Sequence, residues 1–113
     1  MPKIYLKSIF CTLPDEIDKD EIYLIRNDTK IWPEGNLYKR VDSGDKVSID
    51  LEMEVDEGWN SIELWDFDYM SRNDFLGEFK FKVDDAPGNY STSMILKEKN
   101  STASYILNWE IIE

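Results

Sequence analysis

The sequence predicts an all-β fold, an eight-stranded antiparallel β-sandwich, and three observations support this prediction. Apolar and polar residues alternate with a period of two in several segments, as in strands with one buried and one exposed face. Clusters of glycine, proline, asparagine and aspartate separate these segments. No segment sustains the apolar period of a helix. The 113 residues, 42% of them hydrophobic, are enough for one core, so residues 1–113 are expected to form a single domain.

The candidate strands differ in how clearly they alternate. Residues 47–55 and 77–83 alternate strictly, which predicts one buried and one solvated face. Residues 105–112 are fairly apolar on both sides. From the N-terminus, the eight candidates are 4–11, 22–26, 30–32 with 37–40, 47–55, 61–65, 77–83, 90–96 and 105–112. Short strands separated by turns are typical of an antiparallel sandwich.

The charge balance and the missing residue types restrict the chemistry. With 13 basic and 24 acidic residues the net charge is −11, which repels nucleic acid, so no nucleic-acid partner is expected. There is no histidine, and Cys11 is the only cysteine, so zinc sites built on cysteines are excluded. Any metal site must use oxygen ligands, which favours calcium or magnesium. Without a nucleophile elbow or a glycine-rich phosphate loop, the chain is not expected to be an enzyme.

One acidic segment between two candidate strands carries most of the functional information. Asp66, Asp68, Ser71 and Asp74 place three carboxylates and a hydroxyl on a single loop. Calcium takes 6–8 oxygen ligands from carboxylates, carbonyls and waters, so such a loop can surround an ion. The alternative is a solvated acidic turn, which is common for aspartate-rich loops.

The order of residues in this loop resembles a known calcium-binding pattern. The pattern is Asp-x-Asp, a serine or similar residue, another aspartate, and then two apolar residues with glycine and often glutamate. It is matched without a gap by Asp66-Phe67-Asp68, Ser71, Asp74 and Phe75-Leu76-Gly77-Glu78. This run resembles the third calcium-binding loop of C2 domains, and the resemblance implies a C2-like sandwich with three loops meeting at one end.

A second segment resembles the first loop of C2 domains. Asp20-Glu21-Ile22-Tyr23-Leu24 is similar to the Ser-Asp-Pro-Tyr segment at which that loop enters a strand. The resemblance makes Asp20 the second acid of the loop and either Asp15 or Asp18 the first. One candidate strand precedes this loop and three follow the third loop, an order similar to the circularly permuted C2 form of phospholipases.

The resemblance implies Ca2+ as the cofactor. In the middle loop, 41–45, Asp42 or Asp45 is either an extra ligand or part of a solvated turn. Carboxylates gathered without a counter-ion repel one another, so calcium is expected to raise stability substantially by binding the folded state. The implied ligands are Asp15, Asp20, Asp66, Phe67, Asp68, Ser71 and Asp74.

Two functional classes follow from such a site. In the first, the loaded loops dock on a phospholipid membrane surface in a calcium-dependent manner, as in C2 domains. In the second, calcium stabilises a module that binds an unidentified protein or serves a larger assembly. Tyr69 and Met70 could also fold back and cap the sandwich. The expected membrane contacts are Leu13, Ile17, Tyr69, Met70 and Arg72.

The sequence also gives expectations about assembly and location. The N-terminus has no long apolar stretch with a cleavage site, and no segment approaches the ~20 apolar residues of a membrane span. We therefore expect a soluble monomer without a signal peptide or transmembrane segment, either cytoplasmic or peripheral to a membrane.

Overall fold

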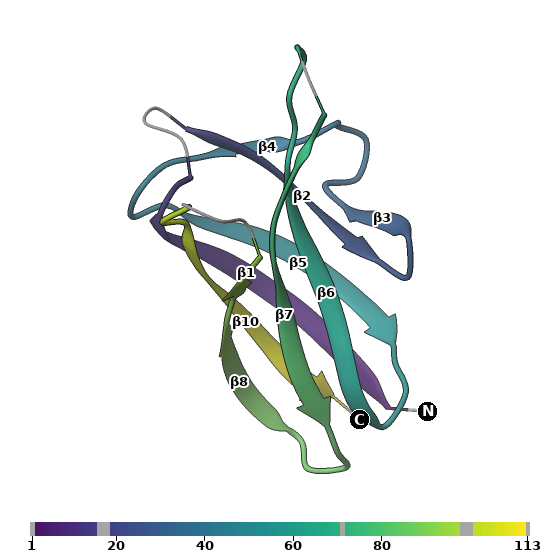
Figure 1. Cartoon of the computed structure of the whole chain (residues 1–113). Helices are drawn as coiled ribbons and strands as arrows, with labels where there is room; N and C mark the ends of the chain where they lie inside the picture. The colour runs from purple at the N-terminus through teal and green to yellow at the C-terminus, as the bar shows by residue number, and fades with distance from the viewer. Residues whose placement is uncertain (1, 16–18, 71, 98–100, 113) are drawn as a thin grey trace.

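A computed structural model describes residues 2–15, 19–70, 72–97 and 101–112, and these residues contain ten strands and no helix. The strands form two facing antiparallel sheets (Figure 1). They are β1 (Lys3–Leu13), β2 (Asp20–Arg26), β3 (Thr29–Trp32), β4 (Lys39–Val41), β5 (Lys46–Glu54), β6 (Gly58–Asp66), β7 (Asp74–Val83), β8 (Gly88–Ser93), β9 (Ile95–Leu96) and β10 (Ser104–Ile112). The all-β prediction is therefore confirmed.

The two sheets differ in strand order, and the core lies between them. The first sheet has the order β5-β1-β10-β8, and the second has the order β3-β2-β6-β7-β9, with β4 also paired to β2. The alternation that predicted the strands also directs their apolar faces inward, because successive side chains point to opposite faces. Leu6, Ile62, Leu64, Phe79 and Leu107 are fully buried members of this core.

The predicted count of eight strands was wrong, because two predicted segments each contain two strands. In the segment 30–40, the chain turns at the cis Trp32–Pro33 bond and at Gly35, which has a φ of +79°. As a result β3 pairs with one half of β2, and β4 pairs with the other half.

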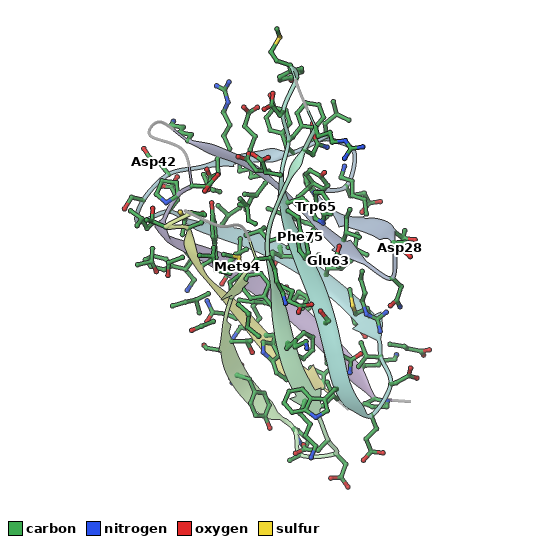
Figure 2. The ribbon with its side chains drawn as sticks, viewed as in Figure 1. Asp28, Asp42, Glu63, Trp65, Phe75 and Met94 are labelled. Atoms are coloured by element: carbon green, nitrogen blue, oxygen red, sulfur yellow. The ribbon has the colours of Figure 1, made fainter. Side chains whose placement is uncertain are left out.

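The second predicted segment that splits is 90–96, where the chain passes from one sheet to the other. β8 pairs with β10 in the first sheet, whereas β9 pairs with β7 in the second sheet. Met94 lies at this crossing and its N–H donates to the carbonyl of Tyr105 at 3.0 Å (Figure 2). The segment 90–96 therefore connects the two sheets along this side of the sandwich.

The loops expected to form a site lie at one end of the sandwich. The end of β1, the start of β2, the end of β6 and the start of β7 are at this end, and both termini are at the opposite end (Figure 1). The 42–45 turn also lies against the end of β1, where the N–H of Cys11 donates to the carbonyl of Asp45 at 2.9 Å. No helix in the described ranges is long and apolar enough to cross a membrane.

Candidate metal centre

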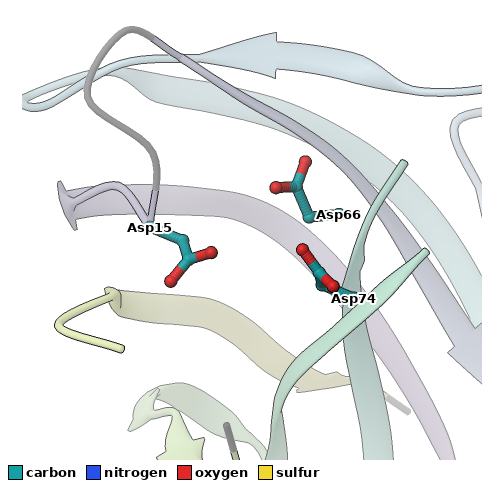
Figure 3. A group of neighbouring side chains, drawn as sticks. All are labelled: Asp15, Asp66 and Asp74. Atoms are coloured by element: carbon teal, nitrogen blue, oxygen red, sulfur yellow. The ribbon is translucent and has the colours of Figure 1, made fainter. Parts of the chain in front are cut away.

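Three aspartates from three strand ends converge at the loop end of the sandwich (Figure 3). Asp15 follows β1, Asp66 is the last residue of β6, and Asp74 is the first residue of β7. Asp66 and Asp74 are cross-strand partners, which fixes their spacing. One carboxylate oxygen from each of the three residues lies within 4.8 Å of the other two.

This geometry fits a calcium ion. Calcium–oxygen distances are about 2.3–2.6 Å, so two ligands of one ion can be up to about 5 Å apart. The span of 4.8 Å among the three oxygens is within that limit. Asp15, Asp66 and Asp74 could therefore hold one calcium ion, with carbonyls or waters completing its coordination.

Hydrogen bonds hold two of these carboxylates in place. Oδ1 of Asp66, which is only 1% exposed, accepts from the N–H of Glu21 at 2.8 Å. Oδ1 of Asp15 accepts from the hydroxyl of Ser101, which precedes β10. Ser101 was not predicted to belong to this site. Its contact with Asp15 joins residues 86 positions apart, and no local sequence pattern reports such a contact.

The carboxylates of the centre disfavour one another's charge. The pKa of Asp74 is raised above 3.8, first by burial and then by the negative charges of Asp15 and Asp68. Burial and like charges both favour the neutral form of a carboxyl. A bound divalent cation would reverse this effect, because it replaces repulsion with attraction.

The structure places Asp20 and Asp68 outside the group of three, although the sequence analysis included both as ligands. Asp20 is fully buried, and its Oδ2 accepts from the N–H of Asp15 at 2.7 Å and from the hydroxyl of Tyr105. Oδ1 of Asp68 accepts from the N–H of Met70 at 2.8 Å. In this arrangement Asp20 positions Asp15, and Asp68 shapes its own loop.

The remaining predicted ligands have different positions. The N–H of Phe67 donates to the carbonyl of Glu21 at 2.7 Å and so ties the third loop to β2. The carboxylates of Asp42 and Asp45 accept N–H groups of their own turn at 2.7 and 2.9 Å. Ile17, Asp18 and Ser71 lie outside the described residues.

Comparison with known proteins identifies the fold. No protein-family model and no curated protein matches the sequence. A solved structure described as "Structure of a C2 domain" matches with a TM-score of 0.59 and 10% sequence identity, and the match covers 100% of both chains. The chain has the C2 fold. The resemblance inferred from the third loop is thus confirmed at the level of the fold.

The third loop of this C2 fold presents apolar side chains to solvent. Met70 is 92% exposed and Tyr69 is 68% exposed, and Arg72 is exposed on the same loop. Tyr69 contacts Phe67 edge-on, with ring centroids 4.8 Å apart, and its hydroxyl lies 2.9 Å from that of Tyr38. Tyr69 therefore caps its neighbours in part, whereas Met70 projects from the fold.

An asparagine that the sequence analysis passed over connects this loop to the neighbouring strand of the C2 fold. Oδ1 of Asn73 accepts from the N–H of Asp68 at 2.9 Å, and its Nδ2 donates to the hydroxyl of Tyr23 at 2.7 Å. The same side chain thus fixes the loop internally and attaches it to β2. The only sequence signal for this role is the position of Asn73 beside Asp74 in the loop.

Proposed function

We propose that this chain is a calcium-binding C2-type module that docks on phospholipid membranes through its loaded loops. The observation that carries this proposal is the convergence of Asp15, Asp66 and Asp74 from three strand ends. The C2 fold is typically that of a binding module rather than a catalytic one, which agrees with the expected absence of enzymatic activity.

The electrostatics support calcium as the ion. The chain has a net charge of −11 and concentrates three carboxylates in one centre. A bound calcium ion supplies two positive charges and can also accept oxygen ligands from a lipid phosphate. Asp15, Asp66 and Asp74 would hold the ion, and Ser101 and Asp20 would keep Asp15 in position through their hydrogen bonds.

The exposed side chains of the third loop support a membrane as the partner. Met70 projects from the loop that connects Asp66 to Asp74, so its exposed side chain lies at the same end of the sandwich as an ion held by these two residues. Burial of an apolar side chain in the bilayer interface is favourable, at about 25 cal/mol per Å². Leu13, which is 44% exposed, and Arg72 would add contacts from the same end of the sandwich.

Calcium titration by calorimetry tests the ion site. The wild-type protein is expected to show saturable binding that Asp66→Asn abolishes. The asparagine keeps an oxygen to accept the N–H of Glu21, so the variant removes the charge and preserves the hydrogen bond. Asp56→Asn, an exposed aspartate outside the group of three, is the control and is expected to bind like the wild type. A wild-type titration without heat of binding would refute the ion site.

Sedimentation with liposomes tests the docking. We expect calcium-dependent pelleting that is strongly reduced by Met70→Ala and unchanged by Trp59→Ala. Trp59 is 72% exposed but lies second in β6, at the opposite end of the strand from Asp66, so it controls for loss of any exposed apolar residue. Calcium binding without pelleting at any lipid composition would refute membrane docking.

A second candidate function is protein binding, and the aromatic cluster of the loop end favours it. Tyr38, Phe67 and Tyr69 form mutual ring contacts, and Leu37 beside them is 61% exposed. Aromatic side chains are enriched at protein interfaces. If calcium binds and liposomes do not pellet the protein, this cluster becomes the expected partner surface.

A further inference from the structure

A polar pocket lies on the outer face of the β5-β1-β10-β8 sheet and is separate from the metal centre. None of its lining residues is acidic, although the chain as a whole has a net charge of −11. Two of them carry ammonium groups, and four others carry amides or aliphatic hydroxyls. These six are Lys7, Lys46, Ser8, Asn89, Ser91 and Asn108. A group of donors without carboxylates favours a small anion.

A bulge in β1 builds this pocket. Leu6 pairs with Trp109 and Ser8 pairs with Asn108, so Lys7 is an extra residue between two consecutive pairs. The bulge interrupts the alternation of faces, which places the side chains of both Lys7 and Ser8 on the outer face. A regular strand would have put only one of them there.

A chain of hydrogen bonds crosses three strands at the floor of the pocket. Ser91 donates to Oδ1 of Asn108 at 2.7 Å, and Nδ2 of Asn108 donates to the hydroxyl oxygen of Ser8 at 3.1 Å. Ser8 is only 4% exposed. Its oxygen acts as an acceptor in this chain, and its proton has no acceptor among the residues that the structure describes. The proton of Ser8 is therefore available to a bound group.

The cationic side of the pocket is also prepared for a ligand. Nζ of Lys7 donates to Oδ1 of Asn89 at 2.9 Å, which leaves the amide Nδ2 of Asn89 as a donor. Lys46 makes no ion pair or side-chain hydrogen bond with any part of the chain that the structure describes. Two ammonium groups, one amide and one buried hydroxyl of the pocket lining therefore keep protons that they can donate to a bound oxyanion.

We propose that this pocket binds the phosphate group of a small soluble phosphomonoester. A phosphate offers several acceptor oxygens and two negative charges, which match the donors of Lys7, Lys46 and Ser8. This site goes beyond the proposed function, because it lies on a sheet face and does not use the calcium-binding residues.

The charges around the pocket favour a small ligand over a charged surface. Asp50, Glu52 and Glu110 lie on the same outer face, close to Tyr5 in the strand pairing. A flat anionic bilayer laid on this face would bring its charge against these carboxylates, and nucleic acid would meet the same repulsion. A compact phosphate ester covers a smaller part of this face than a bilayer does, although Glu110 pairs with Asn89 at the edge of the pocket.

Titration of the full chain with inorganic phosphate in the presence of a chelator tests the site. The chelator excludes binding through calcium, so the result does not depend on the metal centre. We expect saturable binding by the wild type, and about 10- to 100-fold weaker binding by Lys46→Gln and by Lys7→Gln, since each loses a charged hydrogen bond. Lys39→Gln removes an exposed lysine of β4 in the other sheet and is expected to bind as tightly as the wild type.

Two further readouts make the result decisive. In nitrogen–proton NMR spectra, phosphate is expected to shift the side-chain amide signals of Asn89 and Asn108 in the wild type and not in Lys46→Gln. Absence of saturable phosphate binding, or equal affinity in all four proteins, would overturn the proposal. The vesicle experiment tests whether the ligand is soluble. If the wild type in chelator binds vesicles that contain phosphatidylinositol 4-phosphate but does not bind free phosphate, and Lys46→Gln loses the vesicle binding, the ligand is a lipid headgroup. That result would overturn the proposal of a soluble phosphomonoester.

Discussion

Glu78 shows how individual side chains on an acidic protein are stabilised by their neighbours. Its Oε2 accepts from the hydroxyl of Ser61 at 2.7 Å, and its Oε1 lies 3.1 Å from Nζ of Lys97. The hydroxyl of Ser61 and the charges of Lys97 and Lys80 lower the pKa of Glu78 below 4.5, although burial acts in the opposite direction. The charged form of Glu78 therefore stabilises the contact of β7 with its flanking segments.

The lowered pKa predicts how Glu78→Gln changes stability with pH. At pH 7 the variant is expected to be less stable than the wild type by about 1 kcal/mol. It loses the charged hydrogen bond with Ser61 and the partly exposed ion pair with Lys97. The difference should disappear as the pH falls through the lowered pKa, because protonated Glu78 then resembles glutamine. Urea denaturation between pH 7 and pH 3 measures it.

A matched control separates this effect from the general loss of one negative charge. Glu54→Gln neutralises an exposed glutamate at the end of β5 and is expected to change stability little at any pH. If Glu78→Gln and Glu54→Gln gave the same pH profile, the contacts of Glu78 would not contribute to stability.

At the scale of the strands, Gly77 determines how closely β9 approaches β7. A Cβ built at this position would lie 2.4 Å from the carbonyl oxygen of Ile95 and 2.7 Å from Cγ of Met94. Gly77 also pairs with Leu96. Since β9 has only two residues, its place at the edge of the second sheet depends on this close contact.

We expect Gly77→Ala to destabilise the protein by about 1–3 kcal/mol, the usual cost of overpacking. The added methyl group meets backbone, which cannot rotate away as a flexible side chain can. Lys82→Ala on the same strand is the control, because Lys82 is exposed and makes no ion pair with any residue that the structure describes. Urea denaturation measures the free energy of unfolding of both variants. If the two variants are equally stable, β9 moves away from the added methyl group at no cost in stability.

Sequence reasoning predicted the strands that depend on local alternation, and it missed the breaks that depend on distant partners. Residues 47–55 and 105–112 are confirmed as strands because their period of two is visible in the sequence. The break at Met94 was not predicted, because alternation cannot report that β8 and β9 join different sheets. The break at Pro33 could be seen in the sequence, because a proline and a glycine lie there. The sequence did not show that β3 and β4 both pair with β2.

The same limit applies to the candidate metal centre. Asp66 and Asp74 were predicted as ligands because they share one loop, and the structure brings them together with Asp15. Asp20 was predicted from the same kind of pattern, but its contact with Tyr105 could not be seen, because 85 positions separate the two residues. Sequence spacing therefore indicated which acids share a loop, but not which carboxylates of different loops converge.

At the scale of the whole molecule, negative charge dominates, and three carboxylates converge where the loops meet. The net charge is −11, and one calcium ion would change it to −9 by adding two positive charges. Burial and the charges of Asp15 and Asp68 raise the pKa of Asp74, so the folded chain disfavours the charged form of this carboxyl. We therefore expect the stability of the molecule to be coupled to calcium binding at the candidate metal centre.

This coupling predicts opposite effects of Asp74→Asn in the presence and absence of calcium. In chelator the variant is expected to melt at a higher temperature than the wild type, because neutral asparagine removes the repulsion from Asp15 and Asp68. In calcium at about 100 times its dissociation constant, the wild type should gain about 2.7 kcal/mol, or about 10 °C in Tm, and exceed the variant. Asp56→Asn should respond to calcium like the wild type. Differential scanning calorimetry measures all three proteins, and a wild-type Tm that is the same in calcium and in chelator would contradict the coupling.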